Sequence, residues 1–258
     1  MNSKYLNILY TGLSSDNKAL QILAGLDRIN FIHFPTIEII EHELTLDEKM
    51  KLKSPNKYDF IIFTSINSVK YFLNYFENDY SALNCKSKIV AIGQKTASLL
   101  LNNNIDVDLI PQNSSSESID NLLTEALIKN KLILIPGSNL SKADLFNSLE
   151  SKGATVDFVA IYDNIIPNNI ADSLMQKVVD TNFDLFVFTS PSTYYNFLHL
   201  FNIDSSIHYF LGKTIAVIGP VTKAALEKDN IEVQIMPEDF NLISLTNEIK
   251  TYYKLNWE

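Results

Sequence analysis

The chain has 258 residues, 46% of them hydrophobic and 20% charged, which is enough apolar material for two packed domains and argues against a disordered chain. The formal charge is −9 and Arg28 is the sole arginine, so the composition excludes a basic field for binding nucleic acid. A single cysteine, Cys85, excludes an internal disulfide, and no apolar run reaches the roughly 18 residues of a membrane-spanning helix.

Strand and helix patterns alternate along the chain. In chain order, strands are predicted at residues 7–12 and 29–35, within 58–76 and 88–111, at 132–137 and 155–162, and within 183–201 and 214–237, with helices between them. The first residues enter a strand without the layout of a signal peptide, so we expect a cytoplasmic protein. Alternating strands and helices predict parallel sheets with helices on both faces.

One stretch occurs twice. Residues 58–76 and residues 183–201 align without a gap at an offset of 125, with seven of nineteen positions identical. Each copy is a continuous apolar run, which is typical of a strand buried on both faces, followed by Thr-Ser and a helical pattern. The serine is placed to cap the helix, its oxygen accepting a backbone N–H of the first turn.

A second pair, residues 88–111 and 214–237, repeats at an offset of 126 with nine of twenty-four positions identical. Weaker similarity links residues 7–12 to 132–137. A period near 125 residues is too long for a solenoid and indicates duplicated domains. The chain is therefore an internal duplication, and each half is predicted to supply five strands. Size and element count predict two similar flavodoxin-like, parallel-sheet α/β domains.

The connection between the domains has two solutions. In the simpler one, the two halves follow each other in sequence. In the other, the extended segments at residues 35–40 and 162–167 pair as a two-stranded β linker, and the chain crosses between domains at both places. The sequence pattern by itself leaves both open.

Five turns lie at the carboxyl ends of predicted strands, the edge where open α/β sheets bind ligands. Helix N-termini there offer backbone N–H donors that suit a carboxylate or phosphate, so together the turns predict a site for an anion. Taken singly, each Ser or Thr is better explained as a helix cap. The candidate binding residues are Thr64, Ser65, Gly93, Gly137, Ser138, Ser190, Pro191, Ser192, Gly219 and Thr222.

Familiar catalytic patterns are missing from the sequence. There is no dinucleotide fingerprint, P-loop, Ser-His-Asp arrangement or Schiff-base lysine pattern. The four histidines lack metal-ligand spacing, and Cys85 is better explained as a small, partly buried residue than as a nucleophile.

The order and spacing of five pieces, residues 60–72, 91–100, 132–163, 185–197 and 216–226, resemble the uroporphyrinogen-III synthase family. The resemblance implies a discontinuous domain and an inserted domain, with the active site in the cleft between them and with no cofactor or metal. We expect a monomer with no nucleic-acid or membrane partner. The implied boundaries are 1–35 with 167–258 for the first domain, 40–160 for the second, and 36–39 and 161–166 for the linker strands.

The resemblance also implies a reaction. The family closes the linear tetrapyrrole hydroxymethylbilane to uroporphyrinogen III in haem and sirohaem biosynthesis, with loss of water, a spirocyclic intermediate and inversion of ring D. Tyr162, at the end of the strand after Gly153-Ala154, matches the family's tyrosine that assists departure of the hydroxyl group. The alternative is that Tyr162 only packs in the linker.

Two positions depart from the family pattern. Gly12 and Pro136 stand where family members often carry arginine, so binding of a polycarboxylate would depend on backbone N–H groups, hydroxyls and lysines such as Lys95, Lys142 and Lys223. Two other functions therefore stay open, a non-catalytic anion-binding protein and a regulatory module on the same duplicated scaffold.

Overall fold

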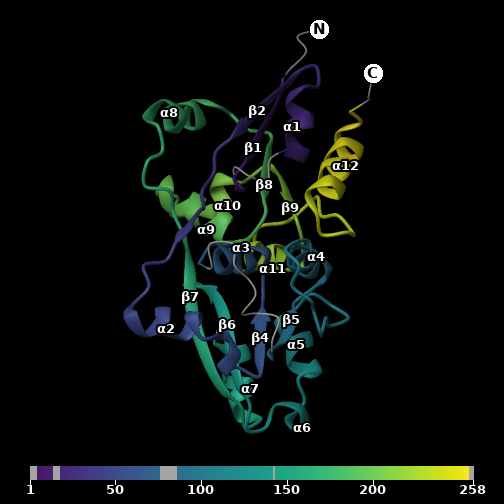
Figure 1. Cartoon of the computed structure of the whole chain (residues 1–258). Helices are drawn as coiled ribbons and strands as arrows, with labels where there is room; N and C mark the ends of the chain where they lie inside the picture. The colour runs from purple at the N-terminus through teal and green to yellow at the C-terminus, as the bar shows by residue number, and fades with distance from the viewer. Residues whose placement is uncertain (1–4, 14–17, 76–85, 142, 256–258) are drawn as a thin grey trace. The chain divides into compact units, whose positions relative to one another are not determined.

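The computed structural model describes residues 5–13, 18–75, 86–141 and 143–255, so Cys85 and Lys142 lie outside the described residues. The chain is an α/β protein with parallel sheets (Figure 1). It divides into two compact units, Met1–Glu38 with Ile165–Glu258 (unit 1) and Ile39–Asn164 (unit 2). Among the helices of the described residues, none has the length and apolar character to cross a bilayer.

Unit 1 contains a parallel sheet in the order β2-β1-β8-β9. An isolated parallel bridge joins Ala216 to Ile235, which gives the 2-1-3-4-5 order of doubly wound sheets. The elements are β1 (Leu6–Tyr10), α1 (Lys18–Ala24), β2 (Ile29–His33), α8 (Asp172–Asp180), β8 (Leu185–Phe188), α9 (Pro191–Leu200), α10 (Ser206–Tyr209), β9 (Thr214–Val217), α11 (Pro220–Lys228) and α12 (Leu242–Tyr253).

Unit 2 contains a sheet in the order β3-β7-β6-β4-β5, in which β7, β6, β4 and β5 are parallel neighbours. An isolated bridge joins Val90 to Leu109. The elements are β3 (Glu38–Glu41), α2 (Leu46–Lys53), a 3₁₀ turn (Pro55–Lys57), β4 (Phe60–Phe63), α3 (Ile66–Tyr75), β5 (Lys88–Ala91), α4 (Gln94–Asn102), α5 (Ser116–Leu122), α6 (Glu125–Ile128), β6 (Leu132–Ser138), α7 (Asp144–Ser151) and β7 (Thr155–Ile165).

The two sheets share one spatial order. By the sequence repeat, β7, β6, β4 and β5 correspond to β2, β1, β8 and β9, so the second sheet is a circular permutation of the first. The repeated aspartates have one structural role, because Asp59 accepts the backbone N–H of Leu132 (2.9 Å) and Asp184 that of Asn7 (3.0 Å). Each carboxylate thereby joins the starts of two neighbouring strands.

The prediction of a full fifth strand in each half is wrong. In each half this segment forms a single β-bridge, at Leu109 in unit 2 and at Ile235 in unit 1. Pro111 and Pro237 follow two residues later in the chain and have no N–H to continue a ladder.

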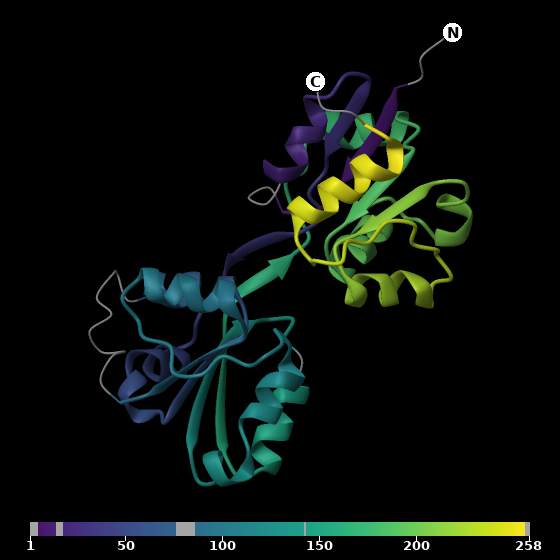
Figure 2. The ribbon, with the colours of Figure 1, turned by 90° about the vertical axis from the view of Figure 1, so that its right-hand side faces the viewer.

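Helices cover both faces of each sheet, as predicted (Figure 2). In unit 2, buried residues of α3 and α4 pack on one face, and those of α5, α6 and α7 pack on the other. In unit 1, α9 and α11 contribute to one core, and α1 and α12 to the other. The central strands β4 and β8 are thus buried at every position, which explains their continuous apolar runs.

The two extended segments pair, as the linker hypothesis requires. β3 is the neighbour of β7, and the backbone N–H of His42 donates to the carbonyl of Ile161 (3.2 Å). Ahead of β3, the buried Thr36 hydroxyl donates to the carbonyls of Thr11 (3.2 Å) and Thr193 (3.0 Å). The segment that leads into β3 is therefore tied to unit 1.

Unit 2 expressed alone, as residues 39–164, should fold cooperatively, because its two hydrophobic cores are made of its own residues. Circular dichroism and dispersed amide signals in an NMR spectrum measure this. The control is residues 1–128, a fragment of similar length that lacks β6 and β7. A disordered 39–164 fragment, or an equally well folded 1–128 fragment, would contradict the division into units.

Candidate active site

The side chain of Tyr162 is placed by a β-bulge. Along β7, Phe158 and Val159 alternate between the two faces of the sheet, and Ile161 lies in the same core as Val159. Gly137 pairs with Ala160, but Ser138 pairs with Tyr162, so Ile161 is an extra residue. Strict alternation would send Tyr162 to the face opposite Ile161. Because of the bulge, Tyr162 packs in the same core as Ile161, on the side covered by α3.

Two residues of the α3 segment hold the buried ring of Tyr162. The ring of Tyr71 stacks on it with a centroid distance of 5.4 Å and an interplanar angle of 21°. The Oη atom of Tyr162 lies 3.0 Å from the Oγ atom of Ser65. A stacked pair of this kind is worth about 0.5–1.5 kcal/mol beyond buried area, so the phenol is held in one orientation.

Ser65 caps α3, as the sequence predicts. Its Oγ atom accepts the backbone N–H of Ser68 (2.8 Å), and its own N–H donates to the Oγ atom of Ser68 (3.2 Å). The hydroxyl of Ser68 in turn donates to the Ser65 carbonyl (2.7 Å). This reciprocal arrangement fixes the Ser65 hydroxyl at the carboxyl end of β4, next to the start of a helix.

A cavity of about 270 Å³ lies against Tyr162 at this edge of the unit 2 sheet. Its wall brings together three of the predicted residues, Thr64, Ser65 and Tyr162. The others on the wall were not identified from the sequence: Ser116, Ser141, Asp144, Leu145 and Phe146. The cavity therefore combines two hydroxyls and a phenol from one side with the helix starts of α5 and α7 from the other.

One signal could have found part of this wall. Ser116 and Asp144 are the first residues of α5 and α7, where the unpaired N–H groups of a helix lie. Asp144 also places a carboxylate in the wall, which favours a cationic or neutral group there over a second carboxylate. The ordinary explanation of Asp144, an acid in the first turn of a helix, accounts for its identity equally well.

The other predicted residues of unit 2 lie at the same edge but outside the lining of this cavity. Gly93 is the N-cap of α4, and Ser138 ends β6 with its hydroxyl accepting the N–H of Leu140 (3.2 Å). A Cβ atom at Gly137 would lie 2.7 Å from the ring of Phe158 and 2.8 Å from Ser141 Oγ, which explains the glycine.

Unit 1 repeats the capping chemistry at its own sheet edge. Ser190 caps α9 by accepting the N–H of Thr193 (3.2 Å), and Pro191 and Ser192 are the next two residues of that helix. Gly219 is the N-cap of α11, in which Thr222 is buried. All of these residues belong to helix starts, although Pro191 has no N–H and the N–H of Ser190 already donates to the Oγ1 atom of Thr193.

Near Gly12 the edge of unit 1 holds an imidazole. The Nε2 atom of His33 lies 2.9 Å from the Gly12 carbonyl, and its ring stacks on Tyr10. Burial lowers the pKa of His33, against the opposing effect of that hydrogen bond. A Cβ atom at Gly12 would lie 2.2 Å from the Oη atom of Tyr10, so the ring of Tyr10 takes the space that a side chain at residue 12 would need.

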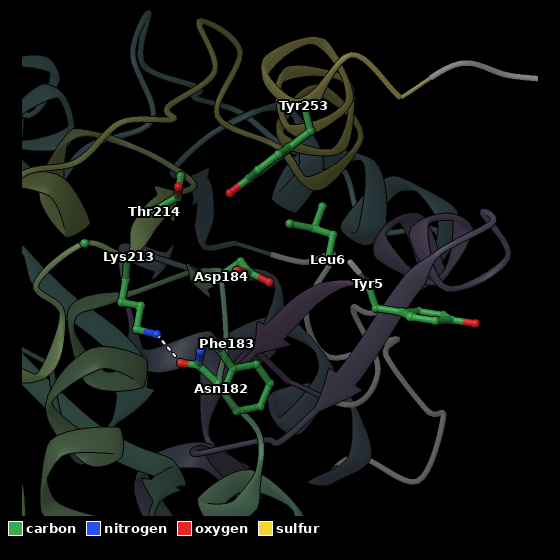
Figure 3. A pocket seen from close by; sticks show the side chains of 9 residues that line it. Tyr5, Leu6, Asn182, Phe183, Asp184, Lys213, Thr214 and Tyr253 are labelled. Atoms are coloured by element: carbon green, nitrogen blue, oxygen red, sulfur yellow. Dashed lines mark hydrogen bonds between the residues drawn. The ribbon is translucent and has the colours of Figure 1, made fainter. Parts of the chain in front are cut away.

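A larger hollow, about 410 Å³, lies at the opposite, amino-terminal edge of the unit 1 sheet (Figure 3). Its polar groups serve the sheet and its turns, since Asp184 accepts the N–H of Asn7 and Lys213 donates to Asn182. None of the predicted site residues lines it. Volume alone therefore does not identify the site, and ligand binding at open α/β sheets favours the smaller cavity at the carboxyl edge.

Within the described residues, no three His, Cys, Asp or Glu side chains gather as ligands for a metal ion. The chemical groups at the cavity are hydroxyls, a phenol, a carboxylate and helix N-termini. Together with the two duplicated α/β units, they place the chain in the class of open α/β-sheet proteins, whose ligands generally bind at the carboxyl ends of the strands.

Comparisons with known proteins identify the family. Residues 24–247 match the family model described as uroporphyrinogen-III synthase HemD. The chain is 28% identical to the uroporphyrinogen-III synthase of Chlorobaculum parvum, over 83% of this chain and 85% of that one. It is 25% identical to that of Synechococcus elongatus, over 86% and 85%. The chain belongs to the uroporphyrinogen-III synthase family.

Solved structures show the same fold. A mutant uroporphyrinogen III synthase of Thermus thermophilus superposes with a TM-score of 0.71 at 14% identity, covering 97% of this chain and all of the other. The synthetase of Helicobacter pylori gives 0.61 at 16% identity, with the same coverage.

Replacing Gly93 by alanine should destabilise the protein by about 1–3 kcal/mol, because the new Cβ atom would lie 2.0 Å from Ser114 Oγ and 2.9 Å from Ser114 Cβ. Urea unfolding measures the loss. Gly25→Ala is the control, since its nearest neighbour, the Ile22 carbonyl oxygen, would be 3.6 Å away. Adding Ser114→Gly should recover part of the loss; full stability of Gly93→Ala alone would show that the close approach is unimportant.

Proposed function

We propose that the chain is a cofactor-independent hydro-lyase that closes hydroxymethylbilane to uroporphyrinogen III, with loss of water and inversion of ring D, in haem and sirohaem biosynthesis. The observation that supports this most is the phenol of Tyr162, which is fixed by Ser65 and Tyr71 on the wall of a cavity at the carboxyl edge of a sheet. Family membership supplies the substrate.

Tyr162 acts as the general acid. The bond between carbon and the departing oxygen breaks with its electron pair on the oxygen, and the phenol proton moves to that oxygen to form water. The pyrrole nitrogen stabilises the cation that remains, so the barrier is low for a carbon–oxygen cleavage. The proton released when the ring closes restores the phenol. The protein's remaining contribution is to hold a flexible chain in the productive fold.

Backbone N–H groups at helix starts bind the substrate carboxylates. In unit 2 we assign the binding turns to Thr64, Ser65, Gly93, Gly137 and Ser138, and in unit 1 to Ser190, Pro191, Ser192, Gly219 and Thr222. Side chains already accept the N–H groups of Ser65, Ser138 and Ser190, so these three residues offer their hydroxyls, and Pro191, which has no N–H, only shapes its turn. The charge of the chain favours carboxylate binding by helix termini over binding by cationic side chains. The chain is acidic overall, and it carries glycine and proline at the positions where the family often has arginine. We further propose a cytoplasmic monomer.

The test of the function is the isomer formed from hydroxymethylbilane. Spontaneous closure gives the type I ring, so type III product that requires this protein establishes the activity. Product that stays entirely type I, with hydroxymethylbilane still bound by the protein, would favour a non-catalytic anion-binding protein instead.

Tyr162→Phe should lower kcat roughly ten- to a thousandfold, because it removes the proton donor and leaves the shape of the cavity nearly unchanged. The remaining product should still be type III, since the fold of the bound chain decides the isomer. Steady-state rates with product separation by isomer measure both.

The matched control is Tyr253→Phe, which removes a phenol oxygen beside the larger hollow and should leave kcat unchanged. A Tyr162→Phe variant with the wild-type kcat would remove the phenol from the mechanism.

A further inference from the structure

We propose that Ser65 is a positioning residue for Tyr162, whose hydroxyl donates its hydrogen to the phenol oxygen and so leaves the phenol's own proton free for the departing group. The inference rests on the proposed function. It assigns to Ser65 a role in proton transfer in addition to substrate binding.

The direction of this hydrogen bond follows from the other partners of Ser65. The N–H and carbonyl of Ser65 are both engaged with Ser68, and a lone pair of its Oγ atom already accepts the N–H of Ser68. The hydrogen of the Ser65 hydroxyl is the group that the cap leaves unused. The Oη atom of Tyr162, 3.0 Å away, is an acceptor within reach.

The reverse direction would oppose the chemistry. If Tyr162 donated to Ser65, the phenol proton would point away from the substrate, and a second donor would be directed at an oxygen that already accepts one. When Ser65 donates, the same hydrogen bond also stabilises the phenolate that remains after proton transfer, because hydrogen bonds to an ionised acceptor are stronger than those to a neutral one.

The ring of Tyr162 is prepared for this role by α3. Tyr71 stacks on the ring, and its own hydroxyl donates to the carbonyl of Ile39 in β3 (3.0 Å). The stack sets the plane of the ring, and Ser65 sets the hydrogen-bonding state of its oxygen. Both contacts come from one helix and its cap, so they keep a constant geometry relative to each other.

The duplicated unit shows that the cap does not need a phenol. In unit 1, Ser190 and Thr193 form the same capping box at the start of α9, and the position 125 residues before Tyr162 is Ile37. The capping chemistry is complete there without a tyrosine. The contact between Ser65 and Tyr162 is therefore an additional feature of unit 2 and not a consequence of capping.

The test compares Ser65→Gly with Ser65→Thr. Glycine is tolerated at an N-cap at a cost of only a few tenths of a kcal/mol, so the fold should survive while the donor is lost. We expect the kcat of Ser65→Gly to fall about tenfold, with KM changed much less. Ser65→Thr should keep a kcat near that of the wild type, because threonine retains the hydroxyl. Thr45→Gly, which removes the capping hydroxyl of α2 in the same unit, should keep the wild-type kcat.

The decisive measurement is the double variant. If Ser65 acts through Tyr162, Ser65→Gly should lower kcat no further in a Tyr162→Phe background. The inference is overturned by a full, multiplicative loss in that background, by a wild-type kcat in Ser65→Gly, or by a failure of Ser65→Thr to restore activity. If the wild-type protein forms type III product, the proposed function stands even when the inference about Ser65 fails. If the wild-type protein forms no type III product, both the proposed function and the inference are overturned.

Discussion

The candidate site depends on one extra residue in a β-strand. In a regular strand, Ile161 and Tyr162 would point to opposite faces, and the phenol could not reach the start of α3. The register shift opposite Gly137 and Ser138 places both side chains in the same core. The stack on Tyr71, the contact with Ser65 and the position of the phenol in the cavity wall all follow from it. Gly137 belongs to this arrangement, because a side chain there would collide with Phe158 and Ser141.

Duplication provided two equivalent sheet edges, and in the part of the chain that the structure describes, a phenol contacts the capping serine at the edge of unit 2. The buried strands, the linking aspartates Asp59 and Asp184, and the capping boxes of α3 and α9 occur in both units. Those features are what any copy of the fold needs to be stable. The bulge in β7 and the aromatic stack were found in unit 2, where β7 also pairs with β3. If the proposed function holds, it arises from a few side chains added to a scaffold that serves both units.

Features that depend on nearby residues could be predicted from the sequence. The apolar runs predict the buried strands, and the Thr-Ser stops predict the caps at Ser65 and Ser190, because period and capping are local properties. The length of the fifth strand of each half was overestimated, because an apolar run does not show how few hydrogen-bond partners its backbone finds at the edge of a sheet. Ser116 and Asp144 could have been recognised as helix starts, but their approach to Tyr162 could not be predicted, because it depends on packing between elements distant in sequence. The bulge has no sequence signature beyond a glycine.

The central claim is that the tetrapyrrole binds at the cavity beside Tyr162 and not at the larger hollow near Tyr253. The most direct measurement is an NMR titration of protein carrying ¹³C-labelled tyrosine with uroporphyrinogen III, with signals assigned through Tyr→Phe variants. The account predicts that the signals of Tyr162 and Tyr71 shift on binding and saturate together, while those of Tyr253 and Tyr5 stay in place. Saturable shifts at Tyr253 and Tyr5, with Tyr162 and Tyr71 unchanged, would contradict it.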